Sequence, residues 1–298
     1  MDTIKKVKRG KSVTPWIAPS IIVLLLITIL PTLFLFYLSL NSWELATPWD
    51  TRKLVWLKNF IDDIKDEQFQ NSLVVTMKYV VVVVLLEFVF GLIIAAFIKG
   101  QNPGMRIFMI VALILPMTLT PSVAGLIWRS NFHPVAGVVN YFLSSLFGLK
   151  INWYSKEYAL LSTMIVDIWQ WTPFTSLILF SGMEAVSQDC YEAAMIDGAS
   201  SFKVLTRITI PLLKPVILIV LLMRIMDALK MFDVVFVMTE GGPGNTTELL
   251  SLNIYRIGFF HTGYLGRASS IAVILLILVT ILSQILIRSF GAREEGKG

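Results

Sequence analysis

Long apolar runs alternate with short polar segments along the whole chain. Each run approaches or exceeds the roughly 20 residues that an α-helix needs to cross a bilayer. The pattern predicts membrane spans near residues 16–39, 72–98, 107–128, 159–182, 216–238 and 269–287. We therefore expect an all-α, polytopic membrane protein with six transmembrane helices, preceded by a tail at 1–15 and followed by one at 288–298.

Composition supports the membrane class and limits other chemistry. The chain has 298 residues, of which 56% are hydrophobic and 15% charged, whereas soluble domains carry about a quarter charged residues. The first run is too long for a signal peptide and no small-residue cleavage site follows it, so it is interpreted as a retained span. With Cys190 as its single cysteine, the chain can form no internal disulfide, and we expect no metal site.

The basic residues predict the orientation. The segments that are inner if the N-terminus is cytoplasmic hold 13 lysines and arginines, against nine in the outer segments. The run "MDTIKKVKRGK" directly precedes the first span, where positive charge has most influence on topology. Both termini are therefore predicted to be cytoplasmic. The net charge of +5 reflects this topology, and no nucleic-acid partner is expected.

Charged residues inside a span are costly and are functional candidates by default. In the fifth span, Arg224, Asp227, Ala228 and Met231 share one helical face. An arginine–aspartate pair there could bind sugar hydroxyls or an anionic group, which suggests an acidic saccharide as one option. The same pair could instead hold the helix bundle together as an interhelical ion pair.

The fourth span has a polar and aromatic cluster, "DIWQWTPF". Gln170 offers both a donor and an acceptor, and Trp171 and Phe174 offer aromatic faces for sugar rings. These three are further candidates for substrate binding. The alternative is an ordinary membrane-interface cluster on a helix kinked at Pro173.

A polar island interrupts the apolar pattern between the fourth and fifth spans. Ser187 can cap a first short helix, and Gly198 suits the left-handed position after it. Ser200 or Ser201 can cap a second short helix, which Pro211 should end just before the next span. In contrast, the outer segment "TEGGPGNTTE" is predicted to be a flexible turn cluster, and no constellation typical of an enzyme is present.

The island also carries a motif. Glu192-Ala193-Ala194, Gly198 and the later Ile208, Ile210 and Pro211 resemble the EAA loop of importer-type ABC permeases. The stretches "FDVVFVMTEGGPGNTTELLSLNIYRIGF" and "PFTSLILFSGMEAVSQDCYEAAMIDGAS" resemble the carbohydrate-uptake branch, of the maltose-permease-F and glycerol-phosphate-permease-A type. The resemblance extends from about the first span to the last.

This resemblance implies a permease fold and a division of labour. Loop 183–215 would couple the chain to a cytoplasmic ATP-binding subunit dimer, with contact residues Tyr191, Glu192, Ala193, Ala194, Asp197, Gly198, Ala199, Phe202 and Pro211. ATP and magnesium would bind those partner subunits, so the chain itself would be no enzyme and hold no cofactor. A second homologous permease subunit and an extracytoplasmic solute-binding protein complete the implied assembly.

Function is thus expected to be ATP-driven import of a saccharide by alternating access, in a bacterial inner membrane. The alternative is a secondary transporter driven by an ion gradient, with Glu87, Asp167 and Asp227 as ion carriers. That alternative would leave the EAA-like motif unexplained.

Overall fold

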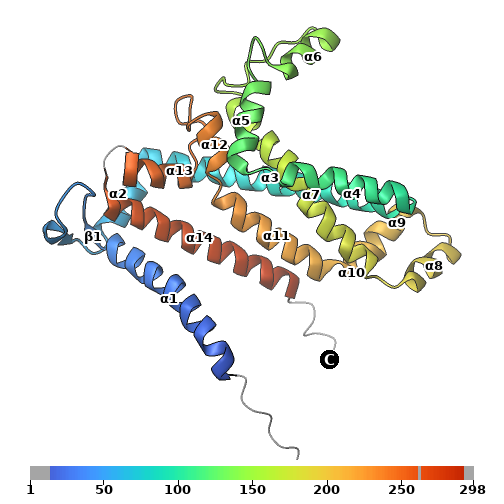
Figure 1. The fold of residues 1–298 in the computed structure, drawn as a ribbon, viewed down its shortest axis with the longest axis horizontal. Helices are drawn as coiled ribbons and strands as arrows, with labels where there is room; N and C mark the ends of the chain where they lie inside the picture. The colour runs from blue at the N-terminus through green and yellow to red at the C-terminus, as the bar shows by residue number, and fades with distance from the viewer. Residues whose placement is uncertain (1–13, 261–262, 292–298) are drawn as a thin grey trace, which may run out of the picture.

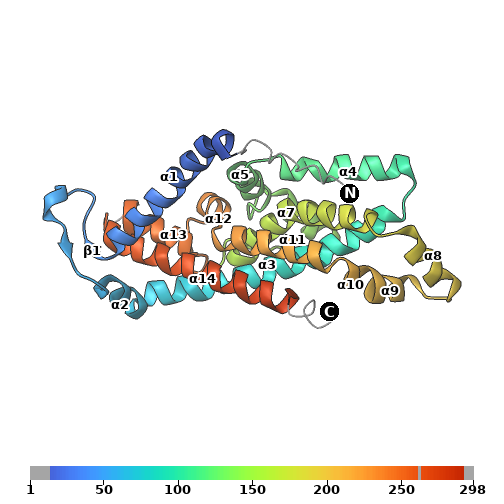
Figure 2. The same cartoon turned by 90° about the horizontal axis from the view of Figure 1, so that it is seen from below.

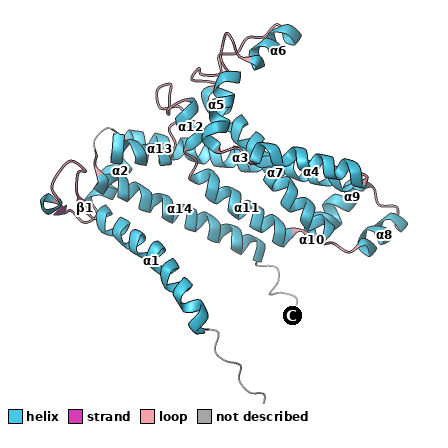
Figure 3. Ribbon diagram, viewed as in Figure 1, coloured by secondary structure: helices cyan, strands magenta, loops and turns pink. Residues whose placement is uncertain are grey.

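Helices dominate the structure, a computed structural model that describes residues 14–260 and 263–291. The described strands are β1 (Asn41–Ser42) and β2 (Lys53–Leu54), two residues each, which pair antiparallel (Figure 3). The all-α prediction is confirmed. Residues 1–13 and 292–298 of the two predicted tails lie outside the described residues.

Four long helices match four predicted spans closely. They are α1 (Thr14–Ser39), α3 (Glu67–Lys99), α7 (Ala159–Glu184) and α14 (Leu265–Gly291). The shorter helices on either side of them are α2 (Lys58–Lys65), α6 (Val138–Phe147), α13 (Leu250–Tyr255), the 3₁₀ turn η1 (Trp49–Thr51) and the π-helical turn η3 (Arg256–Phe260).

The other two predicted spans are broken, and the expectation of continuous helices was wrong there. Span 107–128 consists of α4 (Pro103–Met117) and α5 (Pro121–Asn131), bent by 91°. Pro121 has no backbone N–H to extend α4 and suits the first turn of a new helix. Span 216–238 consists of α11 (Lys214–Leu229) and α12 (Asp233–Met238), separated by three non-helical residues.

Length and hydropathy of the described helices are compatible with the six-span prediction, but they do not by themselves give six spans. Three helices are long and apolar enough to cross a membrane, and up to five if two bent pairs each form one span: α4 with α5, and Ser201–Leu212 with α11. α7 falls outside that count although it has 26 residues, because polar side chains occupy its middle.

The centre of the bundle is the contact between α3 and α7. Gly91 of α3 permits this close approach, because a Cβ there would lie 2.6 Å from the Thr175 side chain and 3.2 Å from the backbone nitrogen of Ser176. α11 packs against both helices and α14 packs against α11. In Figures 1 and 2 the polar island, with α8 (Gln188–Ile196) and α9 (Ser201–Val204), lies at one end of this bundle, and β1, α2 and α13 lie at the other.

The segment "TEGGPGNTTE" is held in place rather than loose, which corrects its prediction as a flexible cluster. The Glu248 side chain is fully buried and accepts hydrogen bonds from Gln68 (3.1 Å) and Arg256 (2.5 Å). The backbone N–H of Leu250 donates to Thr76 (2.9 Å). Contacts with Gln68 and Thr76 of α3 and with Arg256 of η3 therefore fix the end of this segment.

Candidate functional site

Arg224 is the largest of the almost completely buried side chains, 1% exposed within α11. Its Nε and Nη2 donate to both oxygens of Glu87 on α3, at 2.6 and 2.8 Å. Nη2 also lies 3.4 Å from Asp167 on α7. The guanidinium carbon is 5.0 Å from the centre of the Trp171 ring, a cation–π distance. One arginine therefore ties three helices together.

This geometry corrects the expected pairing of Arg224 with Asp227. Asp227 lies on the exposed side of α11 and pairs with Lys230 at 3.5 Å, with about half of its side chain accessible. One helical turn separates the two residues in the sequence, but Arg224 turns inward to the two buried carboxylates. Of the two interpretations left open, the contacts support an interhelical ion pair, with Glu87 and Asp167 as its acids.

A pocket of about 290 Å³ opens beside this network. Four predicted substrate residues line it: Trp171, Arg224, Asp227 and Met231. Its other lining residues are Pro121, Lys230, Phe232 and Asp233. The pocket combines an aromatic face, apolar side chains and charged groups, as small-molecule sites commonly do.

The remaining three substrate candidates lie behind the lining. Gln170 is buried and donates from Nε2 to the carbonyl oxygen of Leu119 (2.7 Å), within the break between α4 and α5. Phe174 packs edge-on against Trp171, with ring centres 6.1 Å apart. Ala228 is buried in the main hydrophobic core. These residues support the pocket and do not form its wall.

Lys230 and Asp233 also line the pocket. They lie beyond the end of α11 at Leu229, so the periodicity of a continuous helix does not describe their positions. Both breaks, between α4 and α5 and between α11 and α12, adjoin the pocket. Interrupted helices are a common way to expose backbone and polar side chains to a substrate inside a membrane.

The polar island has the predicted local structure. It comprises α8 (Gln188–Ile196), α9 (Ser201–Val204), the π-helical turn η2 (Leu205–Thr209) and α10 (Ile210–Leu212). Ser187 accepts from the backbone N–H of Asp189 (3.3 Å) and Ser200 from that of Lys203 (3.4 Å), as N-caps do. Gly198 has φ +69°, the left-handed conformation expected after α8.

The second helical run ends at Leu212, one residue past Pro211 and just before α11, as predicted. The helical run continues through Pro211 to Leu212 and meets α11 at 75°. Pro211 is tolerated because the π-helical turn before it changes the hydrogen-bond register, and Thr209 bonds back to the carbonyl oxygen of Val204 (3.3 Å).

The island presents a mixed, largely exposed surface. Glu192, Ala193 and Asp197 are exposed, and Phe202 is 74% exposed. Ala194 is buried, Tyr191 and Ala199 are half-buried, and Pro211 is exposed. Two further apolar side chains, Met195 and Ile196, are also exposed. The surface therefore offers both charged and apolar side chains for contact with another protein.

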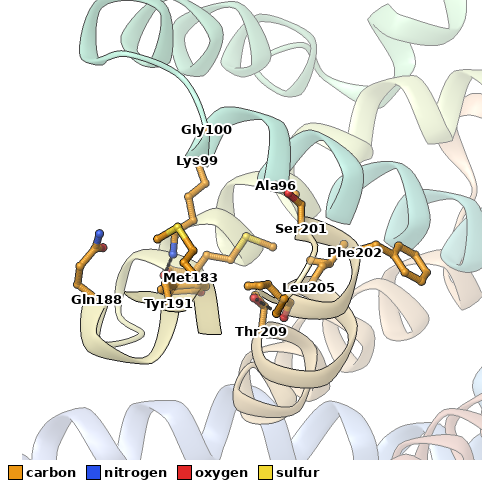
Figure 4. Close-up of a pocket in the computed structure, with 13 residues that line it drawn as sticks. Ala96, Lys99, Gly100, Met183, Gln188, Tyr191, Ser201, Phe202, Leu205 and Thr209 are labelled. Carbon is orange, nitrogen blue, oxygen red and sulfur yellow. Dashed lines mark hydrogen bonds between the residues drawn. The ribbon is translucent and has the colours of Figure 1, made fainter. Parts of the chain in front are cut away.

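Lys99, at the end of α3, was not singled out from the sequence, although it contacts both the end of α7 and the island. Its Nζ donates to the carbonyl oxygen of Met183 (2.7 Å) and lies 3.7 Å from the centre of the Tyr191 ring. Figure 4 shows both residues at a groove of about 630 Å³ between the end of α3 and helices α8 and α9. The signal in the sequence was only a lysine ending a predicted span.

Comparison with known proteins identifies the family. Residues 87–295 match the model of the "Binding-protein-dependent transport system inner membrane component". The chain belongs to this family. It is thus a permease subunit of a membrane transport system and not an enzyme.

Relatives match this permease along most of its length. The probable ABC transporter permease protein y4oQ of Sinorhizobium fredii is 36% identical, over 90% of this chain and 86% of its own. The trehalose/maltose transport system permease protein MalF of Thermococcus litoralis is 34% identical, over 88% of each. The sulfoquinovosyl glycerol transport system permease protein SmoG of Agrobacterium fabrum is 31% identical, over 93% and 90%.

The fold also matches that of a solved importer. A bacterial ABC transporter involved in the import of the acidic polysaccharide alginate superposes with a TM-score of 0.81, at 20% identity, over 95% of this chain and 96% of that one. The importer-type ABC permease fold is therefore confirmed. The alternative of an ion-gradient-driven carrier finds no support in these comparisons.

Proposed function

We propose that this permease carries a saccharide across a bacterial inner membrane through the Trp171–Arg224–Asp227 pocket. The observation that carries the proposal is the position of this pocket at two helix breaks, α4/α5 and α11/α12, with an aromatic ring and hydrogen-bonding groups in its wall. Sugars have apolar ring faces and polar rims, so they suit such a wall. The names of the relatives support a saccharide, since they include trehalose, maltose and sulfoquinovosyl glycerol systems.

The energy for transport would come from a separate cytoplasmic ATPase that binds the polar island. The support is the EAA-like motif together with the exposed surface around Phe202 and Glu192. ATP and magnesium would bind the ATPase dimer, and this chain would hold no cofactor. Residues 191–202 would form most of the contact, with Pro211 at its edge.

The contacts of Lys99 with Met183 and Tyr191 suggest how a movement of the island would reach the pocket. A displacement of α8 pulls on Tyr191 and Lys99 and so on α3, whose Glu87 holds Arg224. The direct contact between α3 and α7 would carry the same movement to Trp171. Alternating access would then follow from the island moving with the ATPase.

Further parts of the assembly follow from the family. A second homologous permease subunit would complete the pathway, and a solute-binding protein would deliver the sugar on the outer side. Both termini of the permease would be cytoplasmic, which places the island and the end of α14 on the side of the ATPase (Figures 1 and 2).

Copurification and a matched pair of glycine variants test the proposal. We expect the permease to copurify with an ATPase whose turnover rises with a binding protein and its sugar. Gly198→Pro should abolish ATP-driven uptake while leaving membrane insertion intact. Gly148→Pro is the matched control, because Gly148 has a similar φ of +66°, ends α6 and also has open space around it. Normal uptake by Gly198→Pro, or no ATPase in the purified complex, would refute the coupling role.

A further inference from the structure

The buried arginine retains an unused donor. Arg224 bonds Glu87 and Asp167 through Nε and Nη2, whereas its Nη1 is buried and has no acceptor among the described residues. Leaving a buried donor unpaired is costly. Arg224 lines the pocket, so a ligand that shifts the side chains covering Nη1 can supply the missing acceptor.

The charges around the pocket sum to a negative value. The lining holds two bases and two acids, and two more acids lie directly behind Arg224: in full, Arg224, Lys230, Asp227, Asp233, Glu87 and Asp167. The sum is −2, or −1 if one proton is shared between the two carboxylates that hold Arg224. Coulomb repulsion is stronger where water is partly excluded. An anionic ligand would therefore meet a net opposing field despite the arginine.

We propose that the pocket selects uncharged saccharides over acidic ones. The sugar ring stacks on Trp171, one sugar oxygen accepts from Nη1 of Arg224, and neighbouring hydroxyls donate to Asp227. A hydroxyl both donates and accepts, so one neutral sugar satisfies both groups without adding charge. This inference rests on the proposed function, and it replaces the acidic saccharide that Arg224 alone suggested.

Equilibrium binding to the complete importer tests the selectivity directly. The importer is held in lipid nanodiscs without its binding protein, so that only the membrane complex discriminates. The probes are radiolabelled maltose and trehalose, and a maltose analogue in which one glucose is replaced by glucuronate. We expect the uronate to bind at least tenfold more weakly than maltose at pH 7. Equal or tighter binding of the uronate would overturn the inference.

Charge variants distinguish electrostatic repulsion of the uronate from a steric misfit of its carboxylate. The double variant Asp227→Asn/Asp233→Asn keeps the shape of both side chains and removes two negative charges. It should reduce the ratio of the Kd of the uronate to the Kd of maltose, here called the gap, at least threefold. Asp189→Asn, which changes an exposed acid of α8, should leave the gap unchanged. An unchanged gap in the double variant would overturn the electrostatic explanation.

The proposed function has an independent measurement. ATP-driven uptake with the binding protein present reports transport, whichever sugar the pocket prefers. If no saccharide is taken up, the proposed function fails. If uptake is intact but neither neutral probe binds, or the uronate is preferred, only the selectivity inference fails.

Discussion

Replacing Arg224 with methionine should destabilise the permease strongly. The change keeps a flexible, unbranched side chain but removes the guanidinium, so Glu87 and Asp167 stay buried without their shared cation. Two short hydrogen bonds, at 2.6 and 2.8 Å, are lost. Removing one partner of a buried ion pair costs about 3–5 kcal/mol, because the remaining charge stays desolvated. We expect a loss of at least about 3 kcal/mol here.

Unfolding in mixed detergent micelles, followed by circular dichroism, measures this loss. The matched control is Lys230→Met, which breaks the exposed pair with Asp227 at 3.5 Å. Exposed pairs contribute little, so that change should stay within about 0.5 kcal/mol. The double variant Arg224→Met/Glu87→Leu should recover at least about 1 kcal/mol, since it removes one of the stranded charges.

Two results would contradict this reasoning. One is an Arg224→Met protein that unfolds within about 0.5 kcal/mol of the parent. The other is strict additivity of the Arg224 and Glu87 changes, because contacting residues should show an interaction energy. Either result would mean that water or lipid headgroups already solvate these carboxylates.

Three further variants probe other contacts. Gly91→Ala should cost about 1–3 kcal/mol in the same unfolding assay, because its Cβ would overlap α7, while Gly100→Ala, whose Cβ has ordinary contacts, should not. Lys99→Met should lower the amount of sugar transported per ATP hydrolysed about two- to fivefold without loss of ATPase binding. The exposed control Lys203→Met should leave that amount unchanged. An unchanged amount in Lys99→Met would exclude a coupling role for the contact between Lys99 and Tyr191. Glu248→Gln should lower the free energy of unfolding by about 1–3 kcal/mol and make segment 239–250 more sensitive to proteases. Equal resistance of the variant and the parent to cleavage would contradict this prediction.

The sequence by itself determined the class of the protein and the local structure of the island. Apolar runs report the free energy of transfer into lipid, which depends only on neighbouring residues, so four spans were located closely. Caps are equally local: Ser187 and Gly198 act within a few residues of their own position. The EAA-like motif also belongs to this local information.

Only the tertiary structure decided how the pocket is built. The same apolar run can form one straight helix or two bent segments, and packing between α5 and α12 favours the bent form. The break between α11 and α12 brings Lys230 and Asp233 to the pocket, against the periodicity of a continuous helix. Arg224 pairs with Glu87, which is 137 residues away in the sequence, and not with Asp227, which is one helical turn away. A buried charge seeks the partner that is also buried, and burial is a property of the assembled helices rather than of any one of them.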